Sequence, residues 1–396
     1  MEKIGIAIVG GGASGLFCAN RLDETKEKVV VFERLDRVGK KLSATGNGQG
    51  NLTNAAVGST AYFSHANNGA ERVSALIRKH GKDAFISFIQ SLGGLCLQDE
   101  RGRVYPTSRQ ASSVTDLLRH AAHRRGVEVR LSQTVKGLEK SGEGFVLTVQ
   151  KDGRDEKIFA EKVVLCAGGK AAKNFGTDGS GYSLATALGH TVTPTYPSLV
   201  QLKTDVTWTK TLKGIRVQDC GVRVLQRGKE RLRLQGDVIF TDYGVSGDGV
   251  FRASAYIADS LADGQVTLSL DFLPQIALEE LSACLQGNRG EEPLCGVVNN
   301  QIGRAILRRS AEEGKSVCAL VKDFPLRVTG SLGFDYAQVT KGGVSFDEVD
   351  DTLQSVYAKG LYFAGEVLDV DGPCGGFNLQ WAYTSACVVA DAICRK

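Results

Sequence analysis

The sequence predicts an α/β protein that carries a β-rich insertion, and three observations support this fold class. First, residues 4–10 (IGIAIVG) and 29–33 (VVVFE) read as short buried strands, with apolar residues at helical spacing between them. Second, alternating strands follow one another between residues 192 and 275 without a long helix, which is typical of an antiparallel or barrel-like domain. Third, residues 277–323 have a helical pattern, and β-rich character returns from residue 325.

Composition excludes several classes of protein. Of the 396 residues 48 are glycine and only 7 are proline, without a Gly-x-y repeat, so the chain is not collagen-like. The apolar fraction of 42% and the charged fraction of 23% indicate a globular chain. The glycine excess suggests many positions where the backbone turns tightly or approaches a ligand closely.

Charge and cysteine spacing point away from nucleic acids, membranes and metals. The formal net charge is +4 and no basic run stands out, so we expect no nucleic-acid partner. No segment has the length of a membrane helix, and MEKIGIAIVGGG reads as strand and turn rather than a signal peptide, so we expect a cytoplasmic protein. The ten cysteines and the pair His120 and His123 lack redox or metal-site spacing, and we predict no metal.

The first predicted site is a dinucleotide-binding turn. Gly10, Gly12 and Gly15 follow the first strand and open a helix, in the Gly-x-Gly-x-x-Gly spacing that brings a pyrophosphate to the N-terminus of a helix. Glu33 ends the second strand, where a carboxylate accepts hydrogen bonds from ribose hydroxyls and repels a 2′-phosphate. We expect Ala13, Ser14 and Arg34 to take part in this site.

Further glycine-rich segments favour FAD over NAD as the dinucleotide. Residues 37–54 (RVGKKLSATGNGQGNLTN) form a long irregular segment, in which lysines can pair with phosphate. Residues 163–169 (VVLCAGG) and 360–366 (GLYFAGE) each run from an apolar strand into glycine, and a Gly-Gly pair precedes the last helix. A helix N-terminus there would stabilise a reduced isoalloxazine ring. The predicted FAD-binding residues of these segments are Lys40, Lys41, Thr45, Gly46, Asn47, Gly48, Asn51, Leu52, Thr53, Asn54, Val135, Ala167, Gly168, Gly169, Gly365, Glu366, Gly376, Phe377, Asn378 and Leu379.

These motifs resemble the BaiN-like, or aminoacetone-oxidase-like, family of bacterial NAD(P)/FAD-dependent flavoproteins. The resemblance covers nearly the whole chain and is strongest in four stretches: GKKLSATGNGQGNLTN, FTDYGVSGDGVFRAS, VTKGGVSFDEVD and GLYFAGEVLDVDGPCGGFNLQWAYTSA. It implies a discontinuous Rossmann-like FAD-binding domain with an inserted antiparallel β-barrel-like domain and a small helical subdomain. We therefore expect residues 1–190 and 325–396 in the FAD-binding domain, 191–276 in a β-rich substrate domain and 277–324 in the helical subdomain.

The sequence departs from the family pattern in two places. The family has a cysteine before the asparagine of the long loop, where this chain has Gln49-Gly50-Asn51. The Thr-Met-x-Ser-Lys run before the C-terminal strand is replaced by Thr352-Leu353-Gln354-Ser355-Val356. Substrate preference therefore cannot be copied from any one relative.

The expected activity is that of an FAD-dependent oxidoreductase. The resemblance implies reduction of a C=C bond in an enone, of a steroid or bile-acid kind, or oxidation of a small amine by O₂. No second Gly-x-Gly-x-x-Gly is present, so NADH or NADPH would reach the substrate pocket only transiently. We expect that pocket between the FAD domain and the insertion, with Tyr243, Cys374 and Tyr105 as candidate catalytic residues.

Two alternatives stay open at this point, and so does the oligomeric state. A fumarate-reductase-like enzyme would need converging histidines and arginines, which the positions of the five histidines do not indicate. The small net charge and the lack of an added binding module weigh against the second alternative, a flavin-binding redox sensor or an accessory protein of RNA modification.

Overall fold

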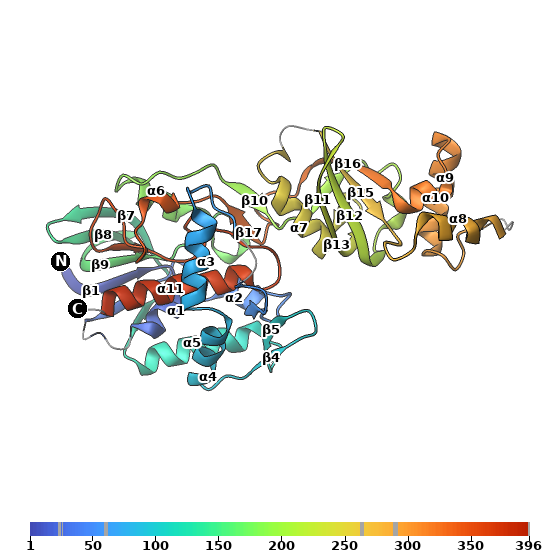
Figure 1. Ribbon diagram of the computed structural model, residues 1–396. Helices are drawn as coiled ribbons and strands as arrows, with labels where there is room; N and C mark the ends of the chain where they lie inside the picture. The colour runs from blue at the N-terminus through green and yellow to red at the C-terminus, as the bar shows by residue number, and fades with distance from the viewer. Residues whose placement is uncertain (23–24, 26, 59–61, 262–264, 288–291, 395–396) are drawn as a thin grey trace. The chain divides into compact units, whose positions relative to one another are not determined.

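The computed structural model describes residues 1–396 except 23–24, 26, 59–61, 262–264, 288–291 and 395–396 (Figure 1). The chain divides into two compact units: the first combines Met1–Tyr196 with Val339–Lys396, and the second is Pro197–Gln338. Each unit has a hydrophobic core of its own. The predicted combination of a Rossmann-like α/β fold with an antiparallel barrel is confirmed.

A seven-stranded sheet forms the centre of the first unit. Its strands are β1 (Glu2–Val9), β2 (Val29–Phe32), β6 (Glu128–Arg130), β7 (Gln133–Ser141), β8 (Gly144–Lys151), β9 (Arg154–Leu165) and β18 (Leu361–Phe363). The order is β6-β2-β1-β9-β8-β7, and β18 pairs with β9. The pairs β6–β2, β2–β1, β1–β9 and β9–β18 are parallel, which explains why Val29–Phe32 is apolar throughout and buried.

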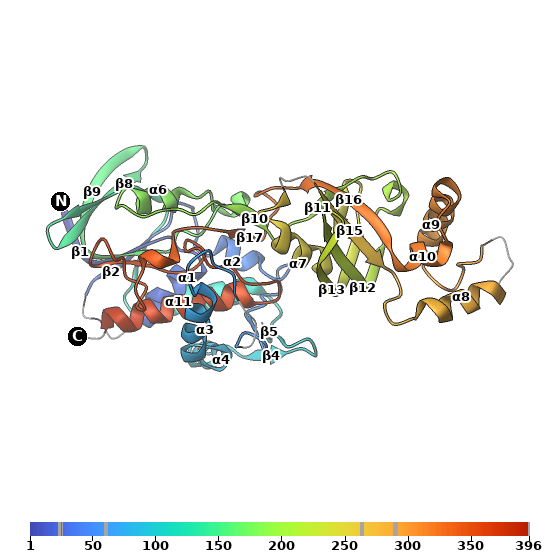
Figure 2. The same ribbon diagram turned by 45° about the horizontal axis from the view of Figure 1, so that its top comes forward.

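Helices pack against this sheet, and the last of them lies beside the first (Figures 1 and 2). The helices of the first unit are α1 (Ala13–Arg21), α2 (Lys40–Ala44), α3 (Gly69–Lys79), α4 (Lys82–Ser91), α5 (Ala111–Arg124), α6 (Ser180–Thr186) and α11 (Phe377–Cys394). Helix α11 is apolar nearly all round and almost completely buried, and Trp381 is among its largest buried side chains. A helix with this pattern belongs in the core rather than on a surface.

Helices α3 and α4 are separated by His80 and Gly81. A Cβ atom at Gly81 would lie 2.8 Å from the carbonyl oxygen of Ile77, so a side chain there would require a shift of the backbone. The segment 37–54, expected to be irregular, contains α2 and the short strand β3 (Thr53–Asn54).

A three-stranded sheet completes the first unit: β3 pairs with β5 (Arg103–Pro106), which pairs with β4 (Cys96–Gln98). Strand β17 (Val339–Lys341) pairs with β10 (Tyr196–Ser198), the strand in which the chain passes from the first unit to the second.

The second unit is a closed antiparallel barrel with helices packed on it. Its strands, in order around the barrel, are β11 (Leu202–Thr204), β14 (Gly244–Ser246), β13 (Lys229–Phe240), β12 (Arg216–Gln226), β15 (Val266–Asp271) and β16 (Phe324–Ser331). Its helices are α7 (Asp248–Ile257), α8 (Leu278–Gly287), α9 (Asn300–Glu313) and α10 (Val317–Lys322). Helix residues such as Leu281 and Ile306 share one core with barrel residues such as Leu268.

The expected return to the FAD domain at residue 325 differs from this division of the chain. Strand β16 pairs with β11 and β15 and closes the barrel, so the segment as far as Gln338 belongs to the second unit. The helices expected as a separate subdomain over 277–324 lie in the same unit. A β pattern alone does not indicate which sheet a strand joins, because that depends on pairing with distant strands.

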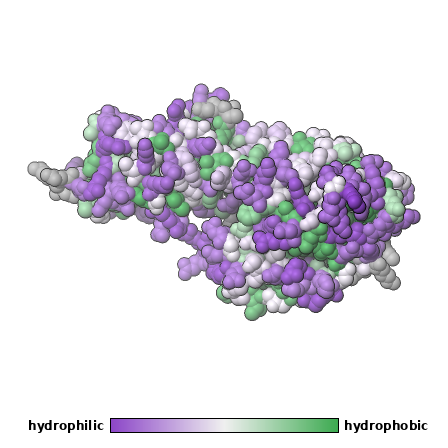
Figure 3. All heavy atoms as spheres, turned by 180° about the vertical axis from the view of Figure 1, so that it is seen from behind, coloured by the Kyte–Doolittle hydropathy of each residue, from purple (hydrophilic) through white to green (hydrophobic). Residues whose placement is uncertain are grey.

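In the part of the chain that the structure describes, no helix is both long enough and apolar enough to cross a membrane. Hydrophilic residues cover most of the face drawn in Figure 3, and hydrophobic residues interrupt them in small groups.

Candidate FAD-binding and active site

The turn between β1 and α1 has the geometry that a pyrophosphate requires. Gly10 has φ +108°, and a Cβ atom there would lie 2.5 Å from the carbonyl oxygen of Cys166. A Cβ on Gly15 would lie 1.9 Å from the carbonyl oxygen of Gly10, so Gly15 is required for helix–strand packing. A Cβ on Gly12 would meet no atom within 4 Å. Gly12 thus borders open space, with Ala13 and Ser14 in the first turn of α1 beside it.

The side chain of Glu33 is hydrogen-bonded to this turn. Its Oε2 accepts a hydrogen bond from the backbone N–H of Gly11 at 2.9 Å, and its Oε1 accepts one from Leu35 at 2.8 Å. The side chain is buried, and burial raises the pKa of its carboxyl group above the ordinary value. Each carboxylate oxygen retains a second lone pair, so Glu33 can still accept a hydrogen bond from a ribose hydroxyl.

Arg34, Val135 and Ala167, three further residues of the predicted site, have defined contacts or burial within the protein. Arg34 forms an ion pair with Asp178 at 2.5 Å, and Val135 is buried in β7. Ala167 follows β9, and a Cβ on Gly181 would lie 2.7 Å from its side chain.

The loop around α2 connects the two distant halves of the first unit. Lys40 pairs with Asp36 at 2.8 Å, and Lys41 pairs with Glu366 at 2.6 Å. Thr45 ends α2, and Gly46, Asn47 and Gly48 all have positive φ. The loop is therefore shaped by left-handed backbone positions that mostly require glycine or asparagine.

The end of this loop is tied to the last helix. The Thr53 hydroxyl donates to Gln380 Oε1 at 2.5 Å, and Asn54 Nδ2 donates to the carbonyl oxygen of Gly375 at 3.0 Å. Leu52 is buried. Asn51 Oδ1 is also buried but accepts no hydrogen bond from any residue that the structure describes. Such an unused acceptor fits a site that a polar ligand completes.

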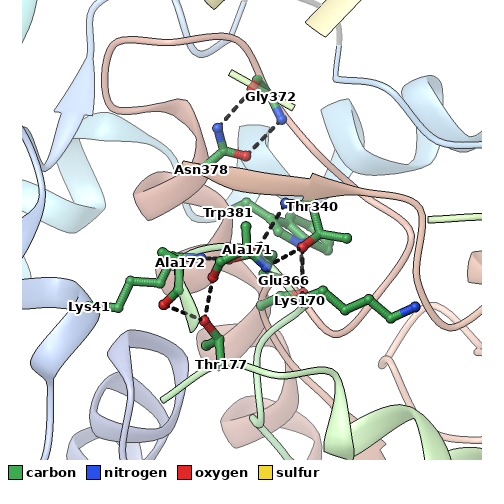
Figure 4. A network of polar contacts seen from close by, with 11 residues as sticks. Lys41, Lys170, Ala171, Ala172, Thr177, Thr340, Glu366, Gly372, Asn378 and Trp381 are labelled. Atoms are coloured by element: carbon green, nitrogen blue, oxygen red, sulfur yellow. Dashed lines mark hydrogen bonds and ion pairs between the residues drawn. The ribbon is translucent and has the colours of Figure 1, made fainter. Parts of the chain in front are cut away.

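Thr340 and Glu366 form a network of polar contacts with Lys41, Lys170 and Ala171 (Figure 4). Glu366 accepts the backbone N–H of Thr340 at 2.9 Å and the ammonium group of Lys41. The Thr340 hydroxyl accepts the backbone N–H groups of Lys170 and Ala171 at 2.8 and 2.9 Å. Both oxygens of the Glu366 carboxylate are therefore engaged by the protein. That Glu366 and Lys41 also contact the cofactor stays a prediction.

The glycines next to this network are required by close packing. A Cβ on Gly169 would lie 2.4 Å from the Thr340 hydroxyl oxygen, and one on Gly365 would lie 2.6 Å from the Ser14 hydroxyl oxygen. Gly168 and Gly365 have φ +71° and +80°. These glycines allow β9 and β18 to end beside the N-terminus of α1.

The Gly-Gly pair lies directly before α11. Gly376 has φ +101°, and a Cβ there would lie 2.6 Å from the carbonyl oxygen of Thr53. The side chain of Asn378 is hydrogen-bonded to Gly372, in the loop that precedes α11 (Figure 4). Its Oδ1 accepts a hydrogen bond from the backbone N–H of Gly372 at 2.9 Å, and its Nδ2 donates one to the carbonyl oxygen of Gly372 at 2.7 Å. Phe377 and Leu379 are buried. Asn378 therefore shapes the loop that precedes the helix.

Two of the three candidate catalytic residues lie in the first unit. Tyr105 is in β5, where burial raises the pKa of its phenol, and the thiol of Cys374 lies close enough to contribute to that increase. Tyr243 belongs to the second unit, between β13 and β14, where its carbonyl oxygen accepts from Thr204. Burial also raises the pKa of the Tyr243 phenol.

Sequence reasoning missed Thr340 and Gln380 as organising residues. Both lie in stretches that we used only for the family resemblance, VTKGGVSFDEVD and GFNLQWAYTSA. No spacing rule indicated them, because the contacts that matter here join distant positions: Thr340 with Glu366, 26 positions away, and Gln380 with Thr53, 327 positions away.

Comparison with known proteins identifies the family. The sequence model described as the HI0933-like protein Rossmann domain matches residues 4–392. The chain is 35% identical to the 3-dehydro-bile acid delta(4,6)-reductase of Clostridium scindens, and the match covers both chains completely. It is 28% identical to the ribosomal RNA dihydrouridine synthase of Escherichia coli, again over the whole of both chains.

Solved structures agree at the level of the fold. A 3-ketosteroid delta1-dehydrogenase from Sterolibacterium denitrificans matches with a TM-score of 0.59 at 13% identity, over the whole of both chains. A flavocytochrome c3 fumarate reductase matches with a TM-score of 0.56 at 15% identity, over all of this chain and 78% of the other. The chain thus belongs to the HI0933-like Rossmann family and is an FAD-dependent oxidoreductase.

Proposed function

We propose that this flavoprotein reduces a carbon–carbon double bond conjugated to a carbonyl group, in a small molecule of the steroid or bile-acid kind, with NADH or NADPH as the electron donor. The observation that carries this proposal is the 35% identity, over the full length of both chains, to a reductase of a 3-dehydro-bile acid.

The residues of the first unit fit FAD. Open space beside Gly12 accommodates a pyrophosphate at the N-terminus of α1, and Glu33 can accept from the ribose next to it. Asn51 offers a buried, unused acceptor near the Gly-Gly turn at Gly376, where a Cβ would lie 2.8 Å from Asn51 Oδ1. When bound, FAD supplies hydride chemistry at N5 of its isoalloxazine ring.

Reduction of such a double bond also needs a proton at the carbon next to the carbonyl group. We assign this proton to Tyr105 because its strand β5 pairs with β3, whose Asn54 donates a hydrogen bond to the carbonyl oxygen of Gly375 in the Gly-rich loop. The phenol is protonated at neutral pH and can donate a proton. Tyr243, from the second unit, is the competing donor. Replacing each tyrosine by phenylalanine separates the two, because only the loss of the true donor slows substrate reduction while bound FAD is retained.

The test is an anaerobic half-reaction experiment. The purified flavoprotein is mixed with NADH or NADPH, and the reduced protein is then offered enones, amines or O₂. We expect bleaching of the flavin absorbance by one nicotinamide and reoxidation by an enone, with a product heavier by two hydrogen atoms. Reduction of the flavin by an amine, with O₂ as the only acceptor, would support the amine-oxidase alternative instead.

A second candidate function is reduction of a uracil base in ribosomal RNA. Two full-length relatives at 28% identity, from Escherichia coli and Haemophilus influenzae, are ribosomal RNA dihydrouridine synthases. The uracil double bond is also conjugated to a carbonyl group, so the chemistry is shared. The small net charge of +4 favours the small-molecule substrate. Formation of dihydrouridine in unmodified ribosomal RNA, with no turnover of steroid enones, would reverse this preference.

The fumarate-reductase-like alternative gains no support from the histidines. His65, His80 and His190 face three different carboxylates, those of Asp369, Asp391 and Glu348. His120 and His123 lie on the exposed side of α5. All ten cysteines are free, which suits the reducing cytoplasm that we propose as the compartment.

A further inference from the structure

The outward face of β4 and β5 combines exposed leucines with an arginine that lacks an acidic partner. Leu95 and Leu97 are 63% and 51% exposed. Leu97 lies directly opposite Tyr105 across the β4–β5 pair, so their side chains share one face. Tyr105 itself is only 6% exposed, because the Arg109 side chain lies over its ring. The other face of β5 carries Val104, which is buried in the protein. The leucines are therefore not needed for the core.

Arg109 supplies the charge on this face. Its guanidinium carbon lies 4.2 Å from the centre of the Tyr105 ring, and its backbone N–H donates to the carbonyl oxygen of Pro106 at 2.9 Å. Among the described residues no carboxylate lies within ion-pair distance of Arg109. The neighbouring Arg103, by contrast, is neutralised by Asp99 at 2.8 Å. Stacking on tyrosine holds the Arg109 guanidinium in place while its hydrogen-bond donors stay available.

This face adjoins the residues that fit FAD. Strand β5 pairs with β3, and Asn54 of β3 donates to the carbonyl oxygen of Gly375. The thiol of Cys374 contributes to the raised pKa of Tyr105. Figures 1 and 2 both show β4 and β5 side by side in the first unit, at a distance from its N- and C-termini.

We propose that Leu95, Leu97 and Arg109, with the Tyr105 ring beneath Arg109, form a substrate-binding surface for a molecule that joins an apolar body to an anionic group, such as an unsaturated keto-steroid carboxylate. This inference rests on the proposed function and names its substrate class. Exposed leucines gain from contact with apolar surface, and an unpaired guanidinium binds a carboxylate through two parallel hydrogen bonds. A polyanion such as RNA would need several cations, and this face offers one that is unpaired.

The test compares an unsaturated keto-steroid acid with its methyl ester. Dissociation constants come from the shift of the flavin absorbance, and kcat/KM from reduction of each compound. We expect the wild type to prefer the acid, and Arg109→Gln to lower this preference about three- to fivefold, the range of an exposed ion pair. The control Arg124→Gln removes an equal charge at the exposed end of α5 and should keep the preference.

The apolar part of the surface is tested separately. Replacing both Leu95 and Leu97 by serine should weaken binding of acid and ester alike, by about fivefold. The control Leu131→Ser changes a leucine that is 41% exposed elsewhere in the same unit. The ratio of FAD to protein in each variant reports whether the fold is intact.

The outcomes separate this proposal from the proposed function. Equal binding of acid and ester by wild type and Arg109→Gln overturns the surface, even if both compounds are reduced. Binding of the acid that depends on Arg109, without reduction, supports the surface and contradicts the proposed reaction. Binding of a uridine-containing RNA that Arg109→Gln weakens, without discrimination between acid and ester, overturns the surface in favour of RNA.

Discussion

Gly12 and Gly15 lie three positions apart, and replacing each by alanine should impair a different property: Gly15→Ala the stability of the protein, and Gly12→Ala the affinity for FAD. At Gly15 the added Cβ would lie 1.9 Å from the Gly10 carbonyl oxygen. Gly10 cannot move away easily, because a Cβ at Gly10 would itself clash with the Cys166 carbonyl oxygen at 2.5 Å. Gly15→Ala should therefore destabilise the protein whether or not FAD is bound.

The magnitudes follow from these contacts. Overpacking of this kind costs about 1–3 kcal/mol in the free energy of unfolding, which corresponds to about 2–4 °C in Tm per kcal/mol for a large domain. At Gly12 the added Cβ meets nothing, and the backbone angles of φ −77° and ψ −163° are allowed for alanine. The apoprotein of Gly12→Ala should therefore be as stable as the wild type, or more stable by about 0.4–1 kcal/mol.

Gly12→Ala should, however, weaken the binding of FAD. The methyl group of Gly12→Ala would occupy the space that a pyrophosphate needs, and we expect the affinity for FAD to fall about 100-fold, or roughly 2.7 kcal/mol. The holoprotein then loses the part of its stability that comes from ligand binding.

The assay measures both quantities on the same samples. Thermal unfolding of the deflavinated proteins gives the stability of the apoprotein, and quenching of FAD fluorescence on titration gives the affinity. The reasoning fails if Gly12→Ala binds FAD as tightly as the wild type, or if its apoprotein is destabilised as much as that of Gly15→Ala.

Three further predictions concern charged groups. The guanidinium of Arg130 and the ammonium of Lys28 lower the pKa of Glu2 to about 2, so Glu2→Gln should lower the free energy of unfolding by about 1 kcal/mol at neutral pH. In thermal unfolding this loss should vanish as the pH falls from 4.5 towards 2, and a constant difference at all pH values would contradict the reasoning. Burial raises the pKa of Glu33, and a protonated carboxyl oxygen accepts a hydrogen bond from ribose less well, so the affinity for FAD should weaken as the pH falls through that raised value. An equal pH dependence in Glu33→Gln would show that another group is responsible. Lys41→Met should lower the free energy of unfolding by about 1–3 kcal/mol, and adding Glu366→Gln should recover part of this loss. If the effects of the two substitutions simply add in the double variant, the 2.6 Å ion pair contributes nothing.

Local patterns could be predicted from the sequence, and long-range pairings could not. Gly10, Gly12 and Gly15 are recognisable because strand, turn and helix follow within a few residues. The pairing of Lys41 with Glu366 spans 325 positions, so each residue alone looked like a ligand for the cofactor. Strand β16 has the same alternation as a strand of the first unit, and only its pairing with β11 and β15 assigns it to the barrel.

Small packing details were also beyond the sequence. No local pattern indicates the close approach of Gly81 to the carbonyl oxygen of Ile77, or the two hydrogen bonds between Asn378 and Gly372. Such preferences are decided by atoms that fold beside a residue from elsewhere in the chain, which neither propensity nor periodicity contains.

The order of the segments along the chain has a consequence for synthesis on the ribosome. Strand β9 needs β18, and α1 needs α11, but β18 and α11 are translated only after residue 360. The uninterrupted segment Pro197–Gln338 has its own core and can fold while the earlier residues still wait for these partners. We expect a nascent chain arrested just after Gln338 has emerged from the ribosome to hold a folded barrel, while the sheet of the first unit is still incomplete and cannot yet capture FAD.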